Sequence, residues 1–144
     1  MENILISACL LGLPCRYDGK EGTALDVEKL RERYNLIPVC PEIFGGLETP
    51  RSPSERVGKR VIMKSGRDVT ENFSRGAHAA LRLCEIFNCK AAILKERSPS
   101  CGSKGIYDGS FSGTLTDGLG VTAEYLLNNG IKVLGESEIS ELLR

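Results

Sequence analysis

Four cysteines lie in loops rich in glycine or proline, where packing alone does not call for a thiol: Cys9, Cys15, Cys40 and Cys101. No two of them form a C-x-x-C pair, the spacing typical of thioredoxin-like sites and zinc ribbons. Thiolates that are far apart in the sequence and meet only in the fold are compatible with an iron–sulfur cluster, and Cys40-Pro41 resembles the cysteine-proline end of ferredoxin ligand runs. The pattern indicates metal or redox chemistry ahead of disulfide bonding.

The other two cysteines have a simpler interpretation. Cys84 and Cys89 lie on or just past a predicted amphipathic helix. Free cysteine is common as a small buried apolar residue. We therefore expect these two thiols to be structural.

Short apolar runs alternate with helical patterns and define the elements that must position the loop thiols. Strands are predicted at 3–8, 36–39, 91–94 and 131–134, and helices at 27–34, 70–88 and 121–129, with Asp26 and Thr70 as caps of the first two. A hairpin is predicted over 60–69 with its turn at Ser65-Gly66, and an irregular loop over 40–56. The alternation predicts an α/β fold: a single domain over residues 1–144, in three layers, with a mostly parallel, Rossmann-like sheet and a small β-hairpin insertion.

Ligands bind outside the carboxyl ends of the strands in such sheets. Cys9, Cys40 and Cys101 each follow a different predicted strand, so all three should converge on one edge of the sheet. Three cysteines on a four-iron cluster would leave one iron as an open Lewis acid. Cys15 is then a fourth ligand, a nucleophile on the substrate side or a structural residue, and the spacing does not choose among these.

Composition narrows the class of partner. Lysine plus arginine equals aspartate plus glutamate at 19 each, tryptophan is absent, and there are only four tyrosines and four phenylalanines. Such a chain does not favour nucleic acid, but it accommodates a nucleotide-sized ligand. The longest apolar stretch, 4–14, is too short for a membrane helix and lacks the basic start of a secretory signal, which predicts a cytoplasmic protein with no membrane partner. Nothing in the sequence indicates an oligomeric state.

Three segments, taken jointly and in this order, carry a resemblance to a known family. They are Ser7-Ala8-Cys9-Leu10 with Gly12 and Cys15-Arg16-Tyr17-Asp18-Gly19, then Pro38-Val39-Cys40-Pro41-Glu42 with Gly45-Gly46-Leu47 and Pro50-Arg51, then Ser98-Pro99-Ser100-Cys101-Gly102. They resemble the signature blocks of the thiouracil desulfidase family, long carried as a domain of unknown function, and the resemblance spans about residues 3–135.

The resemblance implies a cytoplasmic enzyme that removes sulfur from thiolated uracil or a related thio-nucleobase or nucleotide. It implies a [4Fe-4S] cluster held by three cysteines, here Cys9, Cys40 and Cys101, and a free iron that takes the substrate sulfur in a hydrolytic, non-redox reaction. It leaves open whether the substrate is a base, a nucleoside, a nucleotide or a thiolated RNA, and zero net charge disfavours the RNA.

A base must activate the attacking water, and Glu42 is the carboxylate nearest in sequence to Cys40. Our hypothesis is that Glu42 is this base, with its pKa raised by a partly apolar loop. The alternative is that Glu42 accepts loop N–H groups or pairs with Arg51.

Further polar residues of the three segments are candidates with ordinary alternatives. Ser98 and Ser100 could bond substrate or cluster sulfides, although serines beside proline also form turns. Arg16 and Arg51 could hold a phosphate, although loop arginines are often structural. Asp18 could contact substrate, although Asp-Gly is a turn signal.

Two other classes of function remain open from the residues. One is a structural zinc or iron–sulfur protein with four cysteines on the metal and no open position. The other is a thiol redox or sulfur-transfer protein that uses Cys9 and Cys15 without metal.

Overall fold

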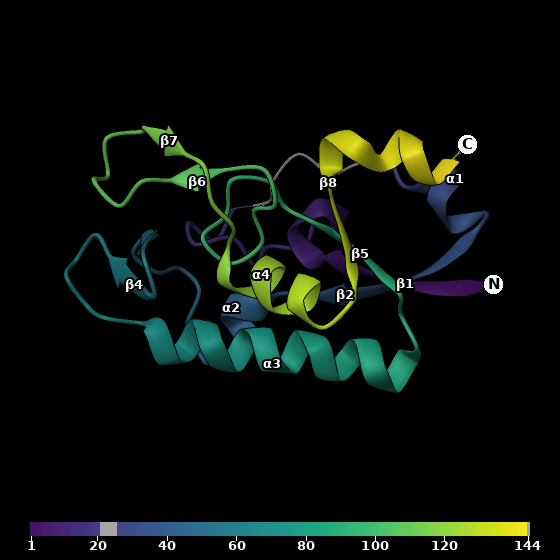
Figure 1. Cartoon of the computed structure of the whole chain (residues 1–144), viewed down its shortest axis with the longest axis horizontal. Helices are drawn as coiled ribbons and strands as arrows, with labels where there is room; N and C mark the ends of the chain where they lie inside the picture. Colours follow the sequence, from purple (N-terminus) through teal and green to yellow (C-terminus); the bar gives the residue numbers. More distant parts are fainter. Residues whose placement is uncertain (21–25, 144) are drawn as a thin grey trace.

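A four-stranded parallel sheet forms the centre of the computed structural model, which describes residues 1–20 and 26–143 (Figure 1). The strand order is β2-β1-β5-β8, where the strands are β1 Glu2–Ser7, β2 Tyr34–Val39, β5 Ala91–Leu94 and β8 Lys132–Gly135. Every pairing in this sheet is parallel. The predicted α/β class is therefore confirmed. The chain first extends the sheet to one side of β1 and then to the other, which opens a crevice at the carboxyl end of β1.

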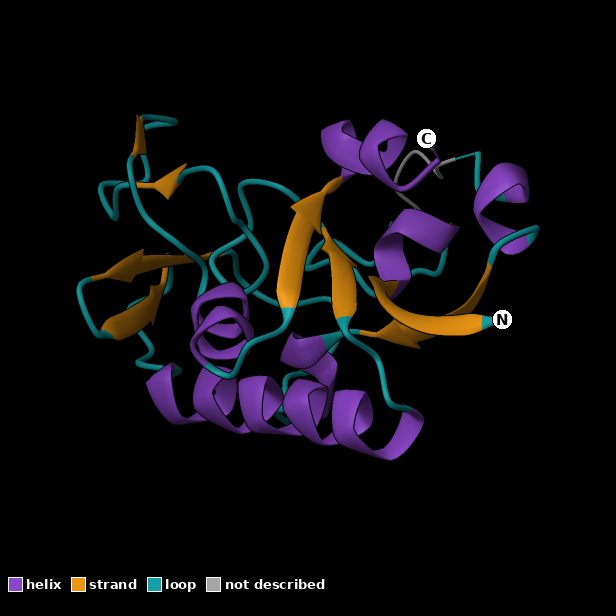
Figure 2. Cartoon of the chain, turned by 45° about the vertical axis from the view of Figure 1, so that its right-hand side comes forward, coloured by secondary structure: helices purple, strands orange, loops and turns teal. Residues whose placement is uncertain are grey.

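Alternating side chains of the strands bury both faces of the sheet and produce three layers. Leu5, Ala92 and Leu94 pack against α3 (Thr70–Phe87) and α4 (Val121–Asn128). Ile4, Ile6 and Ile93 face the other way, toward the elements η1 (Ala8–Leu11), α1 (Glu28–Arg31) and η2 (Glu136–Leu143). Figure 2 shows the long helix α3 crossing one face, while η1, α1 and η2 cover the other. This period-two pattern fixes which side chains face each layer.

The predicted hairpin is present, but its main pairing differs. Strand β4 (Arg60–Met63) pairs antiparallel with β3 (Ser54–Val57), which lies before it in the chain. The tight turn at Ser65-Gly66 also forms, yet it leads only to an isolated bridge between Ile62 and Asp68. The irregular loop predicted over 40–56 thus ends where β3 begins, because the ladder to β4 satisfies the backbone after Pro53.

The observed helix boundaries differ from the predicted ones where tertiary pairing competes with the local sequence pattern. The helix predicted over 27–34 is a single turn, since Tyr34 already pairs with Glu2 in the parallel ladder. Thr70 is the first residue of α3 and not its cap, because Asp68 accepts the Thr70 backbone N–H at 2.9 Å. Asp26 is not the N-cap of α1 either, since Val27 takes that position, although the Asp26 carboxylate accepts the Glu28 N–H at 3.2 Å.

Several short elements were not predicted, and they include η1, the helix α2 (Pro41–Phe44) inside the loop expected over 40–56, and β3. Strands β6 (Ile106–Tyr107) and β7 (Leu115–Thr116) form a second hairpin inside the glycine-rich stretch, and η2 follows β8. Strands of two residues are too short to show a period of two in the sequence. None of the helices within the described ranges is long and apolar enough to cross a membrane.

Candidate active site

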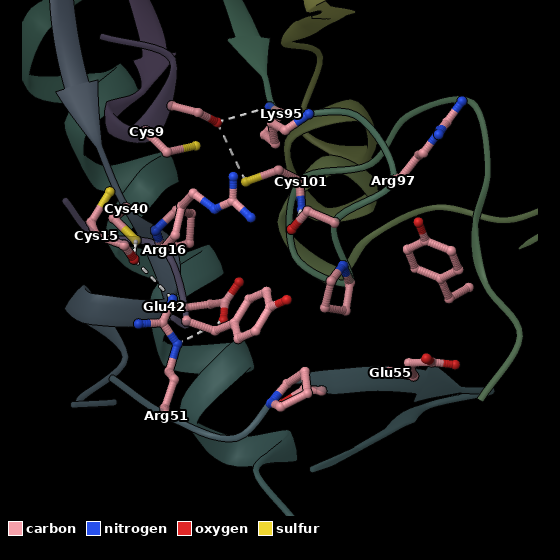
Figure 3. Close-up of a pocket in the computed structure, with 18 of the residues that line it drawn as sticks. Cys9, Cys15, Arg16, Cys40, Glu42, Arg51, Glu55, Lys95, Arg97 and Cys101 are labelled. Carbon is pink, nitrogen blue, oxygen red and sulfur yellow. Dashed lines mark hydrogen bonds and ion pairs between the residues drawn. The ribbon is translucent and has the colours of Figure 1, made fainter. Parts of the chain in front are cut away.

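A cavity of about 600 Å³ opens at the carboxyl ends of β1, β2 and β5, and four cysteines line it. Figure 3 shows Cys9, Cys15 and Cys40 on one side and Cys101 on the other. Cys9, Cys15 and Cys40 are half-buried, whereas Cys101 is buried. The three strands therefore bring residues from distant parts of the sequence to one cavity.

Two short helices position the thiols of Cys9 and Cys40. Cys9 lies in η1, which continues directly from β1 and ends at Gly12 in the left-handed conformation with φ of 84°. Cys40 occupies the N-cap of α2 (Pro41–Phe44), where Pro41 fills the first helical position. Each cysteine is thus placed within one or two residues of a buried strand end.

A close approach between α2 and α3 fixes where Cys40 sits. A β-carbon on Gly76 of α3 would lie 1.9 Å from the carbonyl oxygen of Pro41. Glycine is therefore required at position 76 for α2 to rest on α3. This contact sets the height of Cys40 and Glu42 above the sheet.

The loop that carries Cys101 is held by the N-terminus of α4. Backbone N–H groups of Gly120, Val121 and Thr122 donate to the carbonyl oxygens of Gly102, Pro99 and Ser100, at 2.7 to 2.9 Å. A β-carbon on Gly120 would lie 2.4 Å from the Ser100 carbonyl carbon. Carbonyl oxygens of the Cys101 loop thus accept the first N–H groups of α4. The role of Gly118-Leu119-Gly120 is therefore to allow close packing of the helix against this loop.

Burial and nearby thiols govern the protonation of these cysteines. Burial raises the pKa of Cys101 to about 12, against a hydrogen bond from the Ser7 hydroxyl that lowers it. The contact with Cys15 and burial raise the pKa of Cys40 far above its usual value. The bond with Cys40 lowers the pKa of Cys15, but Cys9 and burial together leave it raised. Without metal, the free chain holds Cys15, Cys40 and Cys101 as thiols, and a bound metal would displace the protons of its ligands.

Glu42 faces the same cavity from α2 and pairs with Arg51. Its Oε1 accepts from Arg51 Nε at 3.1 Å, and among the described residues its Oε2 has no hydrogen-bond partner. Burial raises the pKa of Glu42 even though the guanidinium lowers it. Both interpretations offered by the sequence thus coexist in one carboxylate: it is paired, and it keeps one oxygen toward the cavity.

Arg51 is a structural cation. Its side chain is only 3% exposed, and besides Glu42 it donates to Glu48 O, Thr49 Oγ1 and Cys15 O at 3.0 to 3.3 Å. These bonds tie the Cys15 loop to α2 and leave little of the guanidinium for an anion.

Arg16 and Asp18 differ in where they lie. Arg16 lines the cavity, is 38% exposed, and points into the space between the cysteines (Figure 3). Asp18 is not among the residues that line the cavity; it accepts the Lys20 N–H at 3.0 Å and pairs with Arg16 at 3.4 Å. Asp18 therefore shapes the turn that orients Arg16.

Ser98 and Ser100 serve the Cys101 loop. The Ser98 hydroxyl lines the cavity and accepts the N–H groups of Ser100 and Cys101, each at 3.1 Å. Ser100 is fully buried, does not line the cavity, and shares a 2.8 Å hydrogen bond with Thr122 Oγ1. The structure places Ser100 beneath the loop and outside the lining of the cavity.

Sequence reasoning did not single out the outer part of the cavity. Three aromatic residues and two exposed basic residues line it: Tyr17, Tyr107, Phe111, Lys64 and Arg97. The buried carboxylate of Glu55 joins them and accepts the N–H groups of Gly109 and Phe111 at 2.8 and 3.2 Å. Most come from the two hairpins, whose pairing the local pattern did not reveal. Ser7 was also missed, although its place at the end of β1, two residues before Cys9, was a usable signal.

Cys84 and Cys89 lie away from the cavity in the core between the sheet and α3. Both are about 97–98% buried, and burial raises the pKa of Cys84 to about 12. Their position agrees with a role as small apolar core residues.

The cavity fits a metal cluster better than a single ion. Among residues 1–20 and 26–143, no three His, Cys, Asp or Glu side chains are grouped closely enough to hold one metal ion. A [4Fe-4S] cluster does not need such a group, because each thiolate binds a different iron and the sulfurs surround the cluster. Soft thiolate donors on opposite walls of a 600 Å³ cavity are the donor set that such a cluster takes.

The fold and this cavity define an α/β protein whose thiols meet at the carboxyl edge of a parallel sheet. A family model described as 2-thiouracil desulfurase matches residues 4–138, and the chain belongs to that family.

Two similar proteins cover nearly the whole chain. The solved structure of a [4Fe-4S]-dependent thiouracil desulfidase, TudS, superposes with a TM-score of 0.91 at 46% identity, over 99% of this chain and 95% of that one. The uncharacterized protein YbbK of Bacillus subtilis (strain 168) is 41% identical over 97% of this chain and 99% of its own length.

Proposed function

We propose that this chain is a [4Fe-4S]-dependent desulfidase that removes sulfur from thiolated uracil or a related thio-nucleobase without net redox change. The single observation that carries the proposal is the meeting of Cys9, Cys40 and Cys101 on one cavity at the carboxyl ends of three adjacent strands. Membership of the 2-thiouracil desulfurase family supports the same chemistry.

Cys9, Cys40 and Cys101 are the proposed cluster ligands. When bound through three cysteines, the cluster supplies one iron without a protein ligand, a soft Lewis acid suited to the sulfur of a thiocarbonyl. Cys15 supports this set from beside it: its carbonyl oxygen is held by Arg51, and the Cys40 thiol points toward the same oxygen at 3.9 Å.

Glu42 is the proposed general base. Water attacks the thiocarbonyl carbon and the carboxylate accepts one of its protons. The proton of the hydroxyl that remains on the carbon passes to the sulfur, the carbon–sulfur bond breaks, and sulfur leaves as hydrosulfide while the carbonyl forms. A carboxylate with a raised pKa suits this task near neutral pH, because it is a stronger base than an exposed one. The ion pair with Arg51 fixes Oε1, so that Oε2 is the atom available to the water.

The remaining polar residues position or bind. We propose that Arg16, which points into the cavity, contacts the substrate, and that Asp18 orients Arg16 through their ion pair. Ser98 retains a hydroxyl hydrogen that can be donated into the cavity, while Ser100 and Arg51 hold the Cys101 and Cys15 loops in place.

We further propose a small-molecule substrate and a cytoplasmic location. The aromatic residues of the outer cavity offer faces on which a pyrimidine can stack. The six cysteines are all free, which suits a reducing compartment. Equal numbers of acidic and basic residues give no general attraction for a nucleic acid.

The test is anaerobic purification followed by iron and zinc analysis, an absorption spectrum, and incubation with 2- and 4-thiouracil. The expected result is broad brown absorbance, about four irons per chain and hydrosulfide release with either substrate. A chain that takes only zinc, or no metal after anaerobic reconstitution, would disprove the proposal. A loaded cluster without hydrosulfide release would retain the cofactor and reject the reaction.

A further inference from the structure

The hydroxyl of Ser7 makes two hydrogen bonds at the end of β1. It lies 3.6 Å from Cys101 Sγ and 2.9 Å from the backbone nitrogen of Lys95 (Figure 3). Ser7 is only 2% exposed, which limits the access of bulk water to these bonds. Both partners come from the chain that follows β5, the neighbour of β1 in the sheet.

Chemistry fixes the direction of the Lys95 bond, and it fixes that of the sulfur bond once Cys101 is a thiolate, which can only accept. A backbone N–H can only donate, so the bond with Lys95 uses a lone pair of the Ser7 oxygen. The hydroxyl hydrogen is then free to point at the remaining partner, the sulfur of Cys101. The bond to Lys95 thus orients the hydroxyl as a donor to sulfur.

The same residue also connects strand pairing to the thiol. Leu5 and Ile6 pair with Ala92 and Ile93 in the β1–β5 ladder. The bond from Lys95 N–H to Ser7 Oγ continues this register one step past the end of β5. The position of the hydroxyl is therefore set by the sheet and not by the mobile end of a long side chain.

We propose that Ser7 is a positioning residue of the metal centre, whose hydroxyl donates to the Cys101 thiolate and raises the reduction potential of the bound cluster. This inference rests on the proposed function, in which Cys101 is a cluster ligand. A hydrogen bond to a ligating sulfur withdraws electron density from it, which stabilises the reduced cluster more than the oxidised one. The bond also holds the sulfur in one orientation on the far wall from Cys9 and Cys40.

The experiment compares reconstituted wild type with Ser7→Ala, Ser7→Thr and Ser103→Ala. Ser103 is the matched control, because it is two residues past Cys101 and its buried hydroxyl has no hydrogen-bond partner among the described residues. The midpoint potential of each cluster is measured by anaerobic titration with a strong reductant, and iron release to a chelator is timed.

We expect Ser7→Ala to shift the potential to a more negative value and to release iron several-fold faster, Ser103→Ala to match wild type, and Ser7→Thr to restore the wild-type potential because it keeps the hydroxyl. A merely structural role would lower the melting temperature of the metal-free protein and leave the potential unmoved.

An unchanged potential in Ser7→Ala would overturn the inference while the proposed function stands. If Ser7→Ala does not assemble a cluster, Ser7→Thr decides: a wild-type potential supports the hydroxyl donor, and failure of this variant as well overturns it. If wild type itself takes no cluster, the proposed function and this inference fall together.

Discussion

The cysteines of the cavity are not equivalent, and each can be tested by removal. We expect Cys9→Ala, Cys40→Ala and Cys101→Ala to lose the cluster, because a [4Fe-4S] cluster with only two protein ligands is poorly held. Cys15→Ala should retain about four irons per chain, since its loop is held by the Arg51 bond to its backbone oxygen, which alanine keeps.

Iron content after anaerobic reconstitution is the measurement, with Cys89→Ala as a control outside the cavity. Loss of iron in Cys15→Ala together with retention in one of the other three would assign the ligands differently.

Glu42 provides the pH dependence of the proposed reaction. A base works only when deprotonated, and the pKa of Glu42 is raised above its usual 4.5 by burial. Activity should therefore be full at pH values above this raised pKa and fall as the pH drops through it, at a higher pH than an exposed glutamate would give. The pH profile of kcat measures this loss of activity at low pH directly.

Removing the carboxylate should isolate its role from cluster binding. We expect Glu42→Gln to keep its iron and lose about 10²–10⁴-fold in kcat, the range typical of general base catalysis. Glu48→Gln, an exposed change on the loop that follows α2, is the control. Normal turnover by a fully loaded Glu42→Gln enzyme would remove Glu42 from the mechanism.

At the scale of the elements, the packing of α2 on α3 determines where Cys40 and Glu42 lie in the site. Gly76→Ala would place a methyl group where the Pro41 carbonyl oxygen now lies. Alanine normally suits a helix better than glycine, but here we expect a loss of about 1–3 kcal/mol of stability, the usual cost of overpacking. Iron content should fall as well, because α2 carries Cys40 on its N-cap.

Urea denaturation and iron analysis test this prediction, with the exposed neighbour Arg75→Ala as the control in the same helix. A stable Gly76→Ala protein with full iron would show that α2 can move without disturbing the thiol.

Asp68, just before α3, has a lowered pKa that makes the stability of the fold depend on pH. The Thr70 hydroxyl, the Thr70 N–H and Arg60 all bond the Asp68 carboxylate and lower its pKa from 3.8 to about 2. A lowered pKa in the folded state means that this contribution to stability is present above pH 4 and is lost as the pH falls toward 2. We expect Asp68→Ala to melt at a lower temperature than wild type at pH 7.

The difference between the two melting curves should shrink as the pH falls below 4. A difference that stays constant from pH 7 to pH 2 would assign the effect to packing and not to charge.

Particular elements show what the sequence could and could not predict. The strand at 91–94 and the long helix after Asp68 were read correctly, because their apolar patterns are long or sharply bounded. The pairing of β4 with β3 and the β6–β7 hairpin were missed, since such short strands are defined by partners distant from the local pattern. The cysteine loops were predicted because they follow the strands of the main sheet. Glu55 and the aromatic residues of the outer cavity were not predicted, because most of them belong to the short hairpins.

Across the whole molecule, Glu55 joins the two hairpins over the cavity. From β3 it accepts the N–H groups of Gly109 and Phe111, which lie between β6 and β7. We expect Glu55→Ala to release this segment, raise KM for thiouracil several-fold and leave the iron content unchanged, because the cysteines lie on other elements.

Hydrogen exchange of the amides at 109 and 111 would report the release, and Glu55→Gln, which keeps an acceptor oxygen, is the control. Equal exchange and equal KM in Glu55→Ala and wild type would deny the hairpins any part in holding substrate.

The three-layer core beneath the cavity is built mainly from apolar side chains, and three of the four cavity cysteines remain half-buried at its wall. The stability of the fold therefore depends on the core, whereas the oxygen-sensitive part of the protein is the proposed cluster in the cavity. Oxygen that destroys the cluster would leave a folded chain with its thiols accessible from solvent. Such a protein can be repaired in place, by supplying iron and sulfide to old molecules, without the synthesis of new ones.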